Sequence, residues 1–409
     1  EMIKGIKGGV CAARGFKANG LNAGIKNNTK KDMALVYSEK PCVAAGTFTT
    51  NRVKAAPVKW DYKLVHESDY VQAVVVNSGV ANAATGEEGM KCCMEMSENM
   101  GKALGIPAKA VLVASTGVIG RQLPMDIINA GIAKLPENMA ADEEHAALAA
   151  QAIMTTDTHS KQVAVRIDID GVPVTIGGMC KGSGMIHPNM CTMLCFITTD
   201  CAIDKNLLQK ALSAGIDETF NMISVDGDTS TNDTVLVLAN GMAGNKPITE
   251  EDENYKKFYD ALYYINEELS KLIAGDGEGC TCLFEVRIVN APTKEDAKTL
   301  AKSVITSSLT KAAIFGHDAN WGRILCALGY SGVEFDPEQV DLYFESAAGR
   351  LMIAKAGVQT DYSEEKASEI LSKDHVIATC DCNCGDAHAT AYGCDLTHEY
   401  VSINADYRS

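Results

Sequence analysis

The chain has few aromatic residues, few prolines and no long hydrophobic run. Aromatic residues make up 6% of its 409 residues, and it contains 10 prolines and 2 tryptophans. No apolar stretch reaches the roughly 18 residues that a membrane-spanning helix needs. The first ten residues, EMIKGIKGGV, lack the apolar core of a signal peptide. With 46% hydrophobic residues, the composition is that of a globular protein, and we expect it to be cytoplasmic and to bind no membrane.

Positive charge is also scarce. The chain has 37 lysines and arginines against 53 aspartates and glutamates, which gives a formal net charge of −16. Nucleic-acid binding depends on clustered lysine and arginine, so we expect no nucleic-acid partner. The length predicts two or three domains of about 150 residues each.

Cysteine is abundant, but no CxxC pair occurs among the 15 cysteines. In a long chain without an export signal we expect reduced thiols. Cys380, Cys382 and Cys384 form the one dense cluster, and on a strand their alternation would place all three on one face. Such a face could bind a soft metal. Cysteine is also often buried as a small hydrophobic residue, so core packing is the favoured interpretation and a thiol-rich metal-binding or redox protein is an alternative.

Short β-branched runs alternate with helical patterns along the chain. Runs bounded by Gly, Asn or Asp predict strands, at residues 72–77, 111–114, 162–167, 172–176, 193–199, 234–239, 283–289 and 340–345. Apolar residues at three- and four-residue spacing, with acidic first turns, predict helices, at residues 136–154, 204–216, 250–273, 294–308 and 363–372. Periodicity by itself supports only a mixed α and β fold.

The segment KGSGMIHPNMCTMLCFITTD, residues 181–200, places Thr192 at a junction between a Gly-rich loop and the predicted strand 193–199. A threonine hydroxyl is a weak nucleophile. If the bond between Cys191 and Thr192 were cut, Thr192 would carry a free α-amine, whose pKa of roughly 7.7 to 8.0 suits it to act as the base. The alternative is a strand that merely begins with threonine.

Ten segments of the chain occur in an order that points to one family: GGVCAARGFKANG, TFTTNRVKAAPV, VNSGVANAATG, STGVIG, MTTDT, KGSGMIHPNMCTM, DGDTSTND, GDGEG, GHDANWGRILCALGYSG and CDLTHEYVSINADYRS. In these segments the chain resembles the ornithine acetyltransferase family, the glutamate N-acetyltransferases of arginine biosynthesis. The resemblance covers nearly the whole chain.

The resemblance implies an α+β fold, a four-layer α/β/β/α sandwich that cuts itself inside the fold. It implies an alpha chain of residues 1–191 and a beta chain of residues 192–409, assembled as a dimer of cut protomers. The implied reaction is a ping-pong transfer of acetyl from N2-acetylornithine to glutamate through an acetyl-Thr192 intermediate. Acetyl-CoA is a possible second donor, and neither a cofactor nor a metal is expected.

The resemblance also implies roles for residues outside the nucleophile. Thr116 and Gly117 would form the oxyanion hole, although locally Ser115-Thr116-Gly117 also fits an ordinary tight turn after a strand. The substrate-binding positions would be Thr155, Lys181, Thr192, Glu278, Asn404 and Ser409. Among these, Lys181 offers a cation for a carboxylate and Glu278 an anion for an ammonium group, whereas a solvated lysine and an exposed turn acid are the plain alternatives.

Some positions differ from the family pattern. Cys191 stands where alanine usually precedes the cut, and Ser409 stands where threonine is common. Cys280 and Cys282 lie close enough to Glu278 to alter its surroundings. A different function class, a self-processing threonine amidase or aminopeptidase, uses the same nucleophile but gives the acyl group to water, and dependence on glutamate discriminates between the two.

Overall fold

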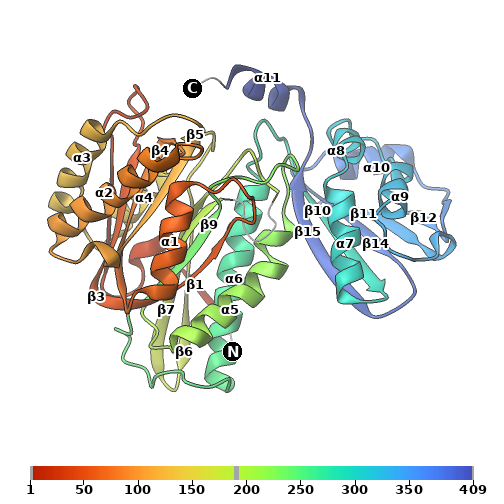
Figure 1. Ribbon diagram of the computed structural model, residues 1–409. Coiled ribbons are helices and arrows are strands. Elements are labelled where there is room, and N and C mark those ends of the chain that lie inside the picture. The colour runs from red at the N-terminus through yellow and green to blue at the C-terminus, as the bar shows by residue number, and fades with distance from the viewer. Residues whose placement is uncertain (1–2, 188–192, 408–409) are drawn as a thin grey trace. The chain divides into compact units, whose positions relative to one another are not determined.

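The computed structural model of the protein describes residues 3–187 and 193–407 (Figure 1). The chain divides into two compact units. The first unit comprises Glu1–Gly182, Pro188–Asp217 and Thr229–Leu269, and the second comprises Ser183–His187, Glu218–Asp228 and Ser270–Ser409. From its length we expected two or three domains, and the structure has two compact units. Each unit builds its own sheet and its own core.

Within the described residues, the first unit contains a nine-stranded sheet in the order β1-β6-β7-β8-β9-β3-β4-β5, with β2 also paired to β3. The strands are β1 (Lys4–Ile6), β2 (Phe16–Leu21), β3 (Met33–Phe48), β4 (Val71–Val80), β5 (Val111–Val118), β6 (Lys161–Ile169), β7 (Val172–Lys181), β8 (Leu194–Thr199) and β9 (Thr234–Ala239).

The long strand β3 joins two parts of this sheet. Its first half pairs with β2 and β4, and its second half pairs with β9, with a register shift between Tyr37 and Cys42. Apolar side chains of both parts form one buried cluster, which includes Val75 of β4 and Phe196 of β8. The two parts of the sheet therefore share one apolar core. Helices and strands are mixed along the chain, and the predicted α+β sandwich class is confirmed.

The helices of the first unit are α1 (Ala56–Glu67), α2 (Gly86–Leu104), α3 (Met125–Lys134), α4 (Glu143–Ala152), α5 (Lys205–Glu218) and α6 (Glu253–Ala274), of which the last residues of α5 and α6 belong to the second unit. Short 3-10 turns lie at η1 (Gly9–Cys11), η2 (Ala108–Ala110) and η3 (Leu135–Asn138). The prediction of one helix over residues 136–154 is wrong at its start. Asp142 caps α4 by accepting a hydrogen bond from the backbone N–H of His145, so the helix begins after it.

The second unit contains a six-stranded sheet, within the part of the chain that the structure describes, in the order β13-β12-β11-β14-β10-β15. Its strands are β10 (Leu283–Ala291), β11 (Asp341–Ser346), β12 (Gly349–Lys355), β13 (Val358–Gln359), β14 (His375–Asp381) and β15 (Ala387–Cys394). Its helices are α7 (Lys294–Ile305), α8 (Ser308–Phe315), α9 (Trp321–Gly329), α10 (Glu364–Leu371) and α11 (His398–Asp406), with 3-10 turns η4 (Phe220–Met222) and η5 (Pro337–Gln339). A second buried cluster, formed by residues such as Phe284 and Leu300, packs this sheet against its helices.

All eight predicted strands are present, as β4 to β11. The predicted helices at 204–216, 250–273 and 363–372 are confirmed as α5, α6 and α10, and the one at 294–308 is α7, which ends at Ile305. The sequence reasoning missed β3 and β15, whose patterns are interrupted by polar or small residues, and the helices α1 and α2.

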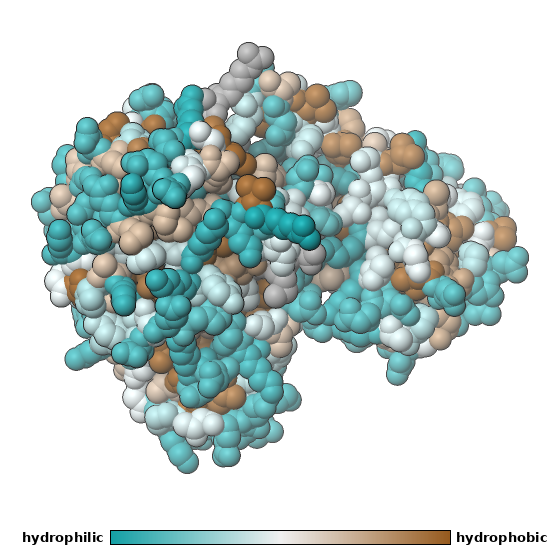
Figure 2. Space-filling view, viewed as in Figure 1, coloured by the Kyte–Doolittle hydropathy of each residue, from teal (hydrophilic) through white to brown (hydrophobic). Residues whose placement is uncertain are grey.

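Among the described residues, no helix is long and apolar enough to cross a membrane. The face drawn in Figure 2 is covered mainly by hydrophilic residues, with hydrophobic residues dispersed among them.

Candidate active site

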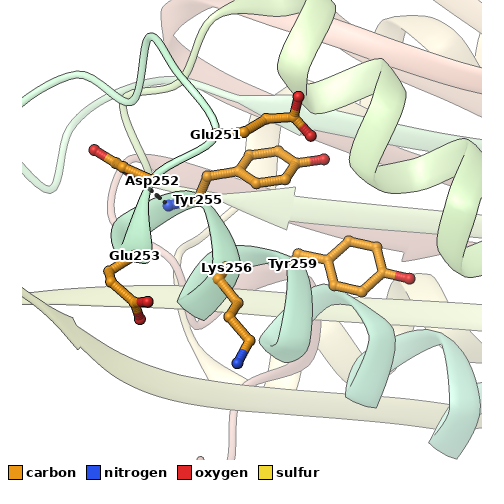
Figure 3. A pocket seen from close by; sticks show the side chains of 6 residues that line it. All are labelled: Glu251, Asp252, Glu253, Tyr255, Lys256 and Tyr259. Carbon is orange, nitrogen blue, oxygen red and sulfur yellow. Dashed lines mark hydrogen bonds between the residues drawn. The ribbon is translucent and has the colours of Figure 1, made fainter.

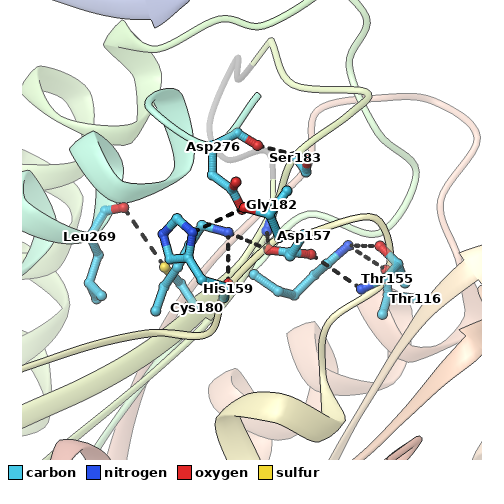
Figure 4. Close-up of polar contacts among 12 residues, drawn as sticks. Thr116, Thr155, Asp157, His159, Cys180, Gly182, Ser183, Leu269 and Asp276 are labelled. Atoms are coloured by element: carbon cyan, nitrogen blue, oxygen red, sulfur yellow. Dashed lines mark hydrogen bonds and ion pairs between the residues drawn. The ribbon is translucent and has the colours of Figure 1, made fainter. Parts of the chain in front are cut away.

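Lys181, at the end of β7, brings together three of the predicted site residues. Its ammonium Nζ donates hydrogen bonds to the hydroxyl of Thr155 at 2.8 Å and to the hydroxyl of Thr116 at 3.1 Å. Figure 4 shows Thr155 and Thr116 side by side in this network. The Lys181 and Thr116 residues are each 8% exposed. The plain alternative of a solvated surface lysine is therefore wrong for Lys181.

The geometry fixes which way the Thr116 hydroxyl can act. An ammonium group has only donors, so the Thr116 oxygen must accept from Lys181. The hydroxyl proton of Thr116 is then left to donate to another acceptor. Because the hydrogen bond from the cation polarises the hydroxyl, the hydroxyl becomes a stronger donor. A developing oxyanion requires such a donor.

The backbone at Thr116 and Gly117, on the edge strand β5, packs closely against β4. Gly117 has φ of 134°, and an added Cβ would lie 2.3 Å from the carbonyl carbon of Gly79 on β4. Asn232 donates to the carbonyl oxygen of Ser115 at 2.7 Å, and the Ser115 hydroxyl donates to Asn77. This position admits only glycine, and the turn keeps one shape.

A buried ion pair supports the Lys181 end of β7. Asp157 accepts hydrogen bonds from the Lys161 ammonium at 2.6 Å and from the backbone N–H of Gly182 at 2.9 Å; Figure 4 shows Asp157 and Gly182. Both side chains of the pair are fully buried. Burial acts to raise the pKa of Asp157, but attraction to Lys181 and Lys161 outweighs it and leaves the pKa below its ordinary value. Asp157 is thus an anion that holds two lysines in place.

Sequence reasoning missed Lys26, which lies near this network. Its ammonium donates to the carbonyl oxygen of Met154 at 2.6 Å, next to Thr155 in the chain. Burial lowers the pKa of Lys26 to about 8; the Asp32 charge opposes this shift and the Lys181 charge adds to it. No motif distinguished it from other lysines. Only the folded position, with its Cγ against Gly79, reveals it.

Glu278 and Asn404 meet in the second unit. The amide nitrogen of Asn404, on α11, donates to the Glu278 carboxylate at 2.5 Å, and the backbone N–H of Glu278 donates to the Ser183 carbonyl oxygen at 3.0 Å. Glu278 is 7% exposed, so the alternative of an exposed turn acid is wrong. The carboxylate lies against Gly184, where an added Cβ would be 2.1 Å from Oε1. This contact joins the C-terminal helix, which carries Asn404, to the turn at Glu278.

Asp226, in the DGDTSTND segment, is a second acid of this unit that sequence reasoning did not single out. Its carboxylate accepts from the backbone N–H groups of Met185 at 2.7 Å and Ile186 at 2.9 Å, and from the Tyr400 hydroxyl at 3.0 Å. Burial raises the pKa of Asp226 above its ordinary value, against the effect of these hydrogen bonds. Asp226 therefore fixes the segment that follows Gly184 and one side of α11.

Three predicted residues, Cys191, Thr192 and Ser409, lie outside the described residues. Met193 is buried, and its carbonyl oxygen accepts a hydrogen bond from the backbone N–H of Thr234 at 2.8 Å. The predicted loop-to-strand transition is present, because β8 begins at Leu194.

The cysteines do not form a metal site in the described residues, where no group of three or more possible ligands occurs. Cys380 and Cys382 are buried in the core of the second unit, while Cys384 is exposed. The prediction of core packing is confirmed for the first two. The three thiols do not share a strand, since β14 ends at Asp381.

A pocket of about 370 Å³ at the start of α6 contains none of the predicted site residues (Figure 3). Its lining is acidic and aromatic, with Tyr255 and Tyr259 stacked at 6.5 Å between ring centroids. Lys210 forms an ion pair with Glu251 at 2.7 Å beside it.

Comparisons with known proteins agree with the sequence segments. The model of the ArgJ family matches residues 17–409. The chain is 52% identical to the arginine biosynthesis bifunctional protein ArgJ 1 of Clostridium acetobutylicum, with 96% of each chain covered. It is 53% identical to ArgJ of Symbiobacterium thermophilum, with 99% of each chain covered. A crystal structure of ornithine acetyltransferase from Mycobacterium tuberculosis, complexed with ornithine, is 41% identical over 46% of this chain and 99% of that chain, with a TM-score of 0.44.

Proposed function

The chain belongs to the ArgJ family, and from that premise we propose that it moves the acetyl group of N2-acetylornithine to glutamate in two half-reactions. In the first, the Thr192 hydroxyl attacks the acetyl carbonyl and ornithine leaves. In the second, the α-amine of glutamate attacks the acetyl-Thr192 ester and N-acetylglutamate leaves. Splitting the transfer in this way lets one nucleophile serve two amino acids in turn.

The observation that carries this proposal is the contact of Lys181 with Thr116. Because the Thr116 oxygen accepts from the lysine at 3.1 Å, its proton is available to the oxyanion that forms on the acetyl carbonyl oxygen. The backbone N–H of Gly117 is the second donor in this assignment. Preorganised donors of this kind typically each contribute a rate factor of about 10² to 10³ in acyl transfer.

The pairing of β7 with β8 supports a cut between Cys191 and Thr192. The two strands are hydrogen-bonded from the pair Ile176 and Thr199 to the pair Lys181 and Leu194. A cut in the connection between them would leave both chains in one sheet, so the protein can be processed without coming apart. The new N-terminal residue would be bonded to Met193, which the Thr234 contact fixes in place.

We assign Lys181 and Glu278 to the charged groups of the amino-acid substrate. Lys181 suits a carboxylate, and it also favours the neutral form of a nearby amine, which is the form needed as base. Glu278 suits an ammonium group, and Asn404 orients its carboxylate. Acetyl-CoA as a second donor, a dimer of cut protomers and a cytoplasmic location are further parts of this proposal.

The test follows the two half-reactions separately. Cut enzyme is mixed with N2-acetylornithine and no acceptor, and the ornithine released is measured together with the mass of the beta-chain N-terminal peptide. We expect about one ornithine per site and an acetyl group on Thr192. Later addition of glutamate should remove that acetyl group and give N-acetylglutamate.

A control with acetyl-CoA in place of acetylornithine decides whether the enzyme is bifunctional. Continuous release of ornithine and acetate without glutamate would refute the transferase and favour the amidase class. Active protein that remains one uncut chain in a denaturing gel would refute the proposed nucleophile.

A further inference from the structure

A basic pocket lies at the start of helices α1 and α2 in the first unit, and the candidate site described above does not use it. Its volume is about 240 Å³; Arg52, Lys54 and Lys59 line it, and none of the described residues in its lining is acidic. All three cations are exposed. Within residues 3–187 and 193–407, none of them forms an ion pair with a carboxylate. In a chain with a net charge of −16, three unpaired cations around one hollow indicate a site for an anion.

The backbone that lines this pocket also suits an anion. Ala84 and Gly86 have positive φ, of 55° and 63°, and Thr85 between them has φ of −114°. Successive residues of opposite handedness turn their N–H groups toward one side, which forms a concave anion site. Thr85, which precedes α2, does not cap the helix with its side chain. The first N–H groups of a helix have no partner within it, so those of α2 suit a ligand anion. Glu87 and Glu88 lie in the same first turn but do not line the pocket.

Hydrogen bonds from the surrounding framework hold the pocket loop in its shape. The N–H of Ala56 donates to the carbonyl oxygen of Asn82 at 3.1 Å, and the N–H of Gly120 donates to that of Ala83 at 2.9 Å. The hydroxyl of Thr85 donates to the side-chain oxygen of Asn82 at 2.7 Å. Asn82 is fully buried and has φ of 51°, a costly conformation that persists only where the surroundings fix it. The pocket is therefore formed before a ligand arrives, and binding does not have to order it.

The pocket loop and the Thr116 turn are built on the same two strands. β4 ends at Val80, which pairs with Thr116 on β5, and the pocket loop follows directly. The amide nitrogen of Asn232 donates to the carbonyl oxygens of Ala81 and Ser115, at 2.6 Å and 2.7 Å. The five residues that follow Val80 reach the pocket and span at most about 18 Å. A ligand that is held in the pocket by its charged end therefore needs an extended arm to bring a reacting group to Thr116.

We propose that this pocket binds the phosphate groups of acetyl-CoA, whose pantetheine arm then carries the acetyl thioester to the Thr116 turn. Arginine binds phosphate oxygens through two parallel N–H groups, and lysines add point charges. Val53 and Met90 also line the pocket and offer apolar contact to the adenine or to the arm. The inference rests on the proposed function, in which acetyl-CoA is a second donor.

Acetyl-CoA needs a binding site of its own because it lacks the groups that the amino-acid site recognises. It has neither an ammonium group for Glu278 nor an amino-acid carboxylate for Lys181. In the transfer, the Thr192 oxygen attacks the thioester carbonyl carbon, and the bond from that carbon to sulfur breaks. The hydroxyl proton passes through the Thr192 α-amine to the leaving sulfur. Coenzyme A leaves as a thiol, and the acetyl-Thr192 ester is the same one that acetylornithine gives.

The experiment compares the two acetyl donors on cut protein, with glutamate as the acceptor, and measures coenzyme A binding by calorimetry. The pocket variant carries three substitutions together: Arg52→Ala, Lys54→Ala and Lys59→Ala. Because three charged contacts are lost at once, we expect the Kd of coenzyme A to rise, and kcat/KM for acetyl-CoA to fall, by about tenfold or more. The constants for acetylornithine should not change. Acetyl-pantetheine, which has the thioester but no phosphate, should react equally with the wild type and the pocket variant.

The control variant removes three exposed lysines of the same unit that do not line the pocket, so that its net charge equals that of the pocket variant: Lys63→Ala, Lys102→Ala and Lys109→Ala. We expect it to bind coenzyme A like the wild type.

Equal affinity of the wild type and the pocket variant for coenzyme A would overturn the proposal, and so would a wild type that binds no coenzyme A. An equal loss in the control variant would overturn it too, since net charge alone would then explain the effect. If pyrophosphate bound at the pocket and coenzyme A did not, the pocket would be a site for free phosphate and the proposal would be wrong. If the wild type transfers no acetyl group from acetylornithine, the proposed function fails, and the coenzyme A affinities of the two proteins then decide the pocket separately.

Discussion

Gly184→Ala should displace the Glu278 carboxylate while leaving the fold intact. The added Cβ would lie 2.1 Å, 2.3 Å and 2.5 Å from three atoms of that carboxyl group. Ordinary contact begins at about 3.4 Å, so the group must withdraw by more than 1 Å. Gly184 does not have positive φ in the described backbone, and alanine therefore adds no backbone strain at this residue.

The displacement has a definite energetic consequence. The hydrogen bond from Asn404 to Glu278 is 2.5 Å long, and a withdrawal of more than 1 Å breaks it. Hydrogen bonds to charged groups contribute roughly 1.5 to 3 kcal/mol, which corresponds to roughly ten- to 150-fold in turnover with either amino acid. Self-cleavage should be unchanged, because Glu278 is assigned only to substrate.

The assay measures kcat/KM for acetylornithine and for glutamate on fully cut variants. Gly329→Ala, at the end of α9, is the matched control, because an added Cβ there meets nothing within 4 Å. A double-mutant cycle with Glu278→Ala tests the route, since coupled residues show non-additive effects. In that background Gly184→Ala should have little further effect.

Two results would refute this reasoning. If Gly184→Ala turned over both substrates at the wild-type rate, the Glu278 position would not matter to the reaction. If it lost activity equally in the presence and absence of the Glu278 side chain, the substitution would act by another route than the carboxylate.

Substitutions at four further positions test the nucleophile, the two charged site residues and one buried acid. Thr192→Ala should abolish both cleavage and transfer, and Thr192→Ser should keep some of each. Mass spectrometry measures the cleavage of the two variants, and rate assays measure their transfer. Normal turnover by the alanine variant would place the nucleophile elsewhere. Lys181→Met should impair both self-cleavage and acetyl transfer, whereas Glu278→Gln should reduce transfer alone, by at least about tenfold. If cut Glu278→Gln and cut wild-type protein had equal kinetic constants, Glu278 would not belong to the site. Asp61 has one carboxylate oxygen without a hydrogen-bond partner in the described residues, and burial raises its pKa well above 3.8. The native state thus holds this proton more tightly than the unfolded state, so the free energy of unfolding should fall as pH rises from 3.8 toward the native pKa. Denaturant unfolding at several pH values should show a weaker fall for Asp61→Asn, and an identical pH dependence would contradict the assignment.

The sequence predicted the strands better than the helices, for a physical reason. Strands such as β4 and β9 are buried on both faces and appear as short, continuous apolar runs. Helix α1 has a proline near its start, but Ala55 before it has no capping side chain and the first turn has no acidic residue, so most of the usual start signals are missing. At residues 136–154, Asp142 looked like a helix-interior residue but acts as the N-cap.

The candidate site was also predictable only in part from the sequence. Residue types by themselves left plain alternatives open: a strand that begins with threonine, a solvated lysine and an exposed turn acid. The resemblance in ten segments indicated the family and, with it, a nucleophile at Thr192, a cation at Lys181 and an anion at Glu278. Charge and nucleophilicity are properties of the side chain, so a sequence can carry them. Whether such a side chain is buried, and what it meets, depends on residues distant in the chain.

Tertiary structure decided those contacts. The Thr116 hydroxyl became a directed donor only because β7 brings Lys181 to it across 65 positions of sequence. The Lys26 contact with the Met154 carbonyl oxygen was likewise invisible in the sequence. Local sequence patterns indicate the chemistry of each side chain. The pairing of distant strands decides which side chains come into contact, and these contacts determine the direction of the hydrogen bonds and the pKa values.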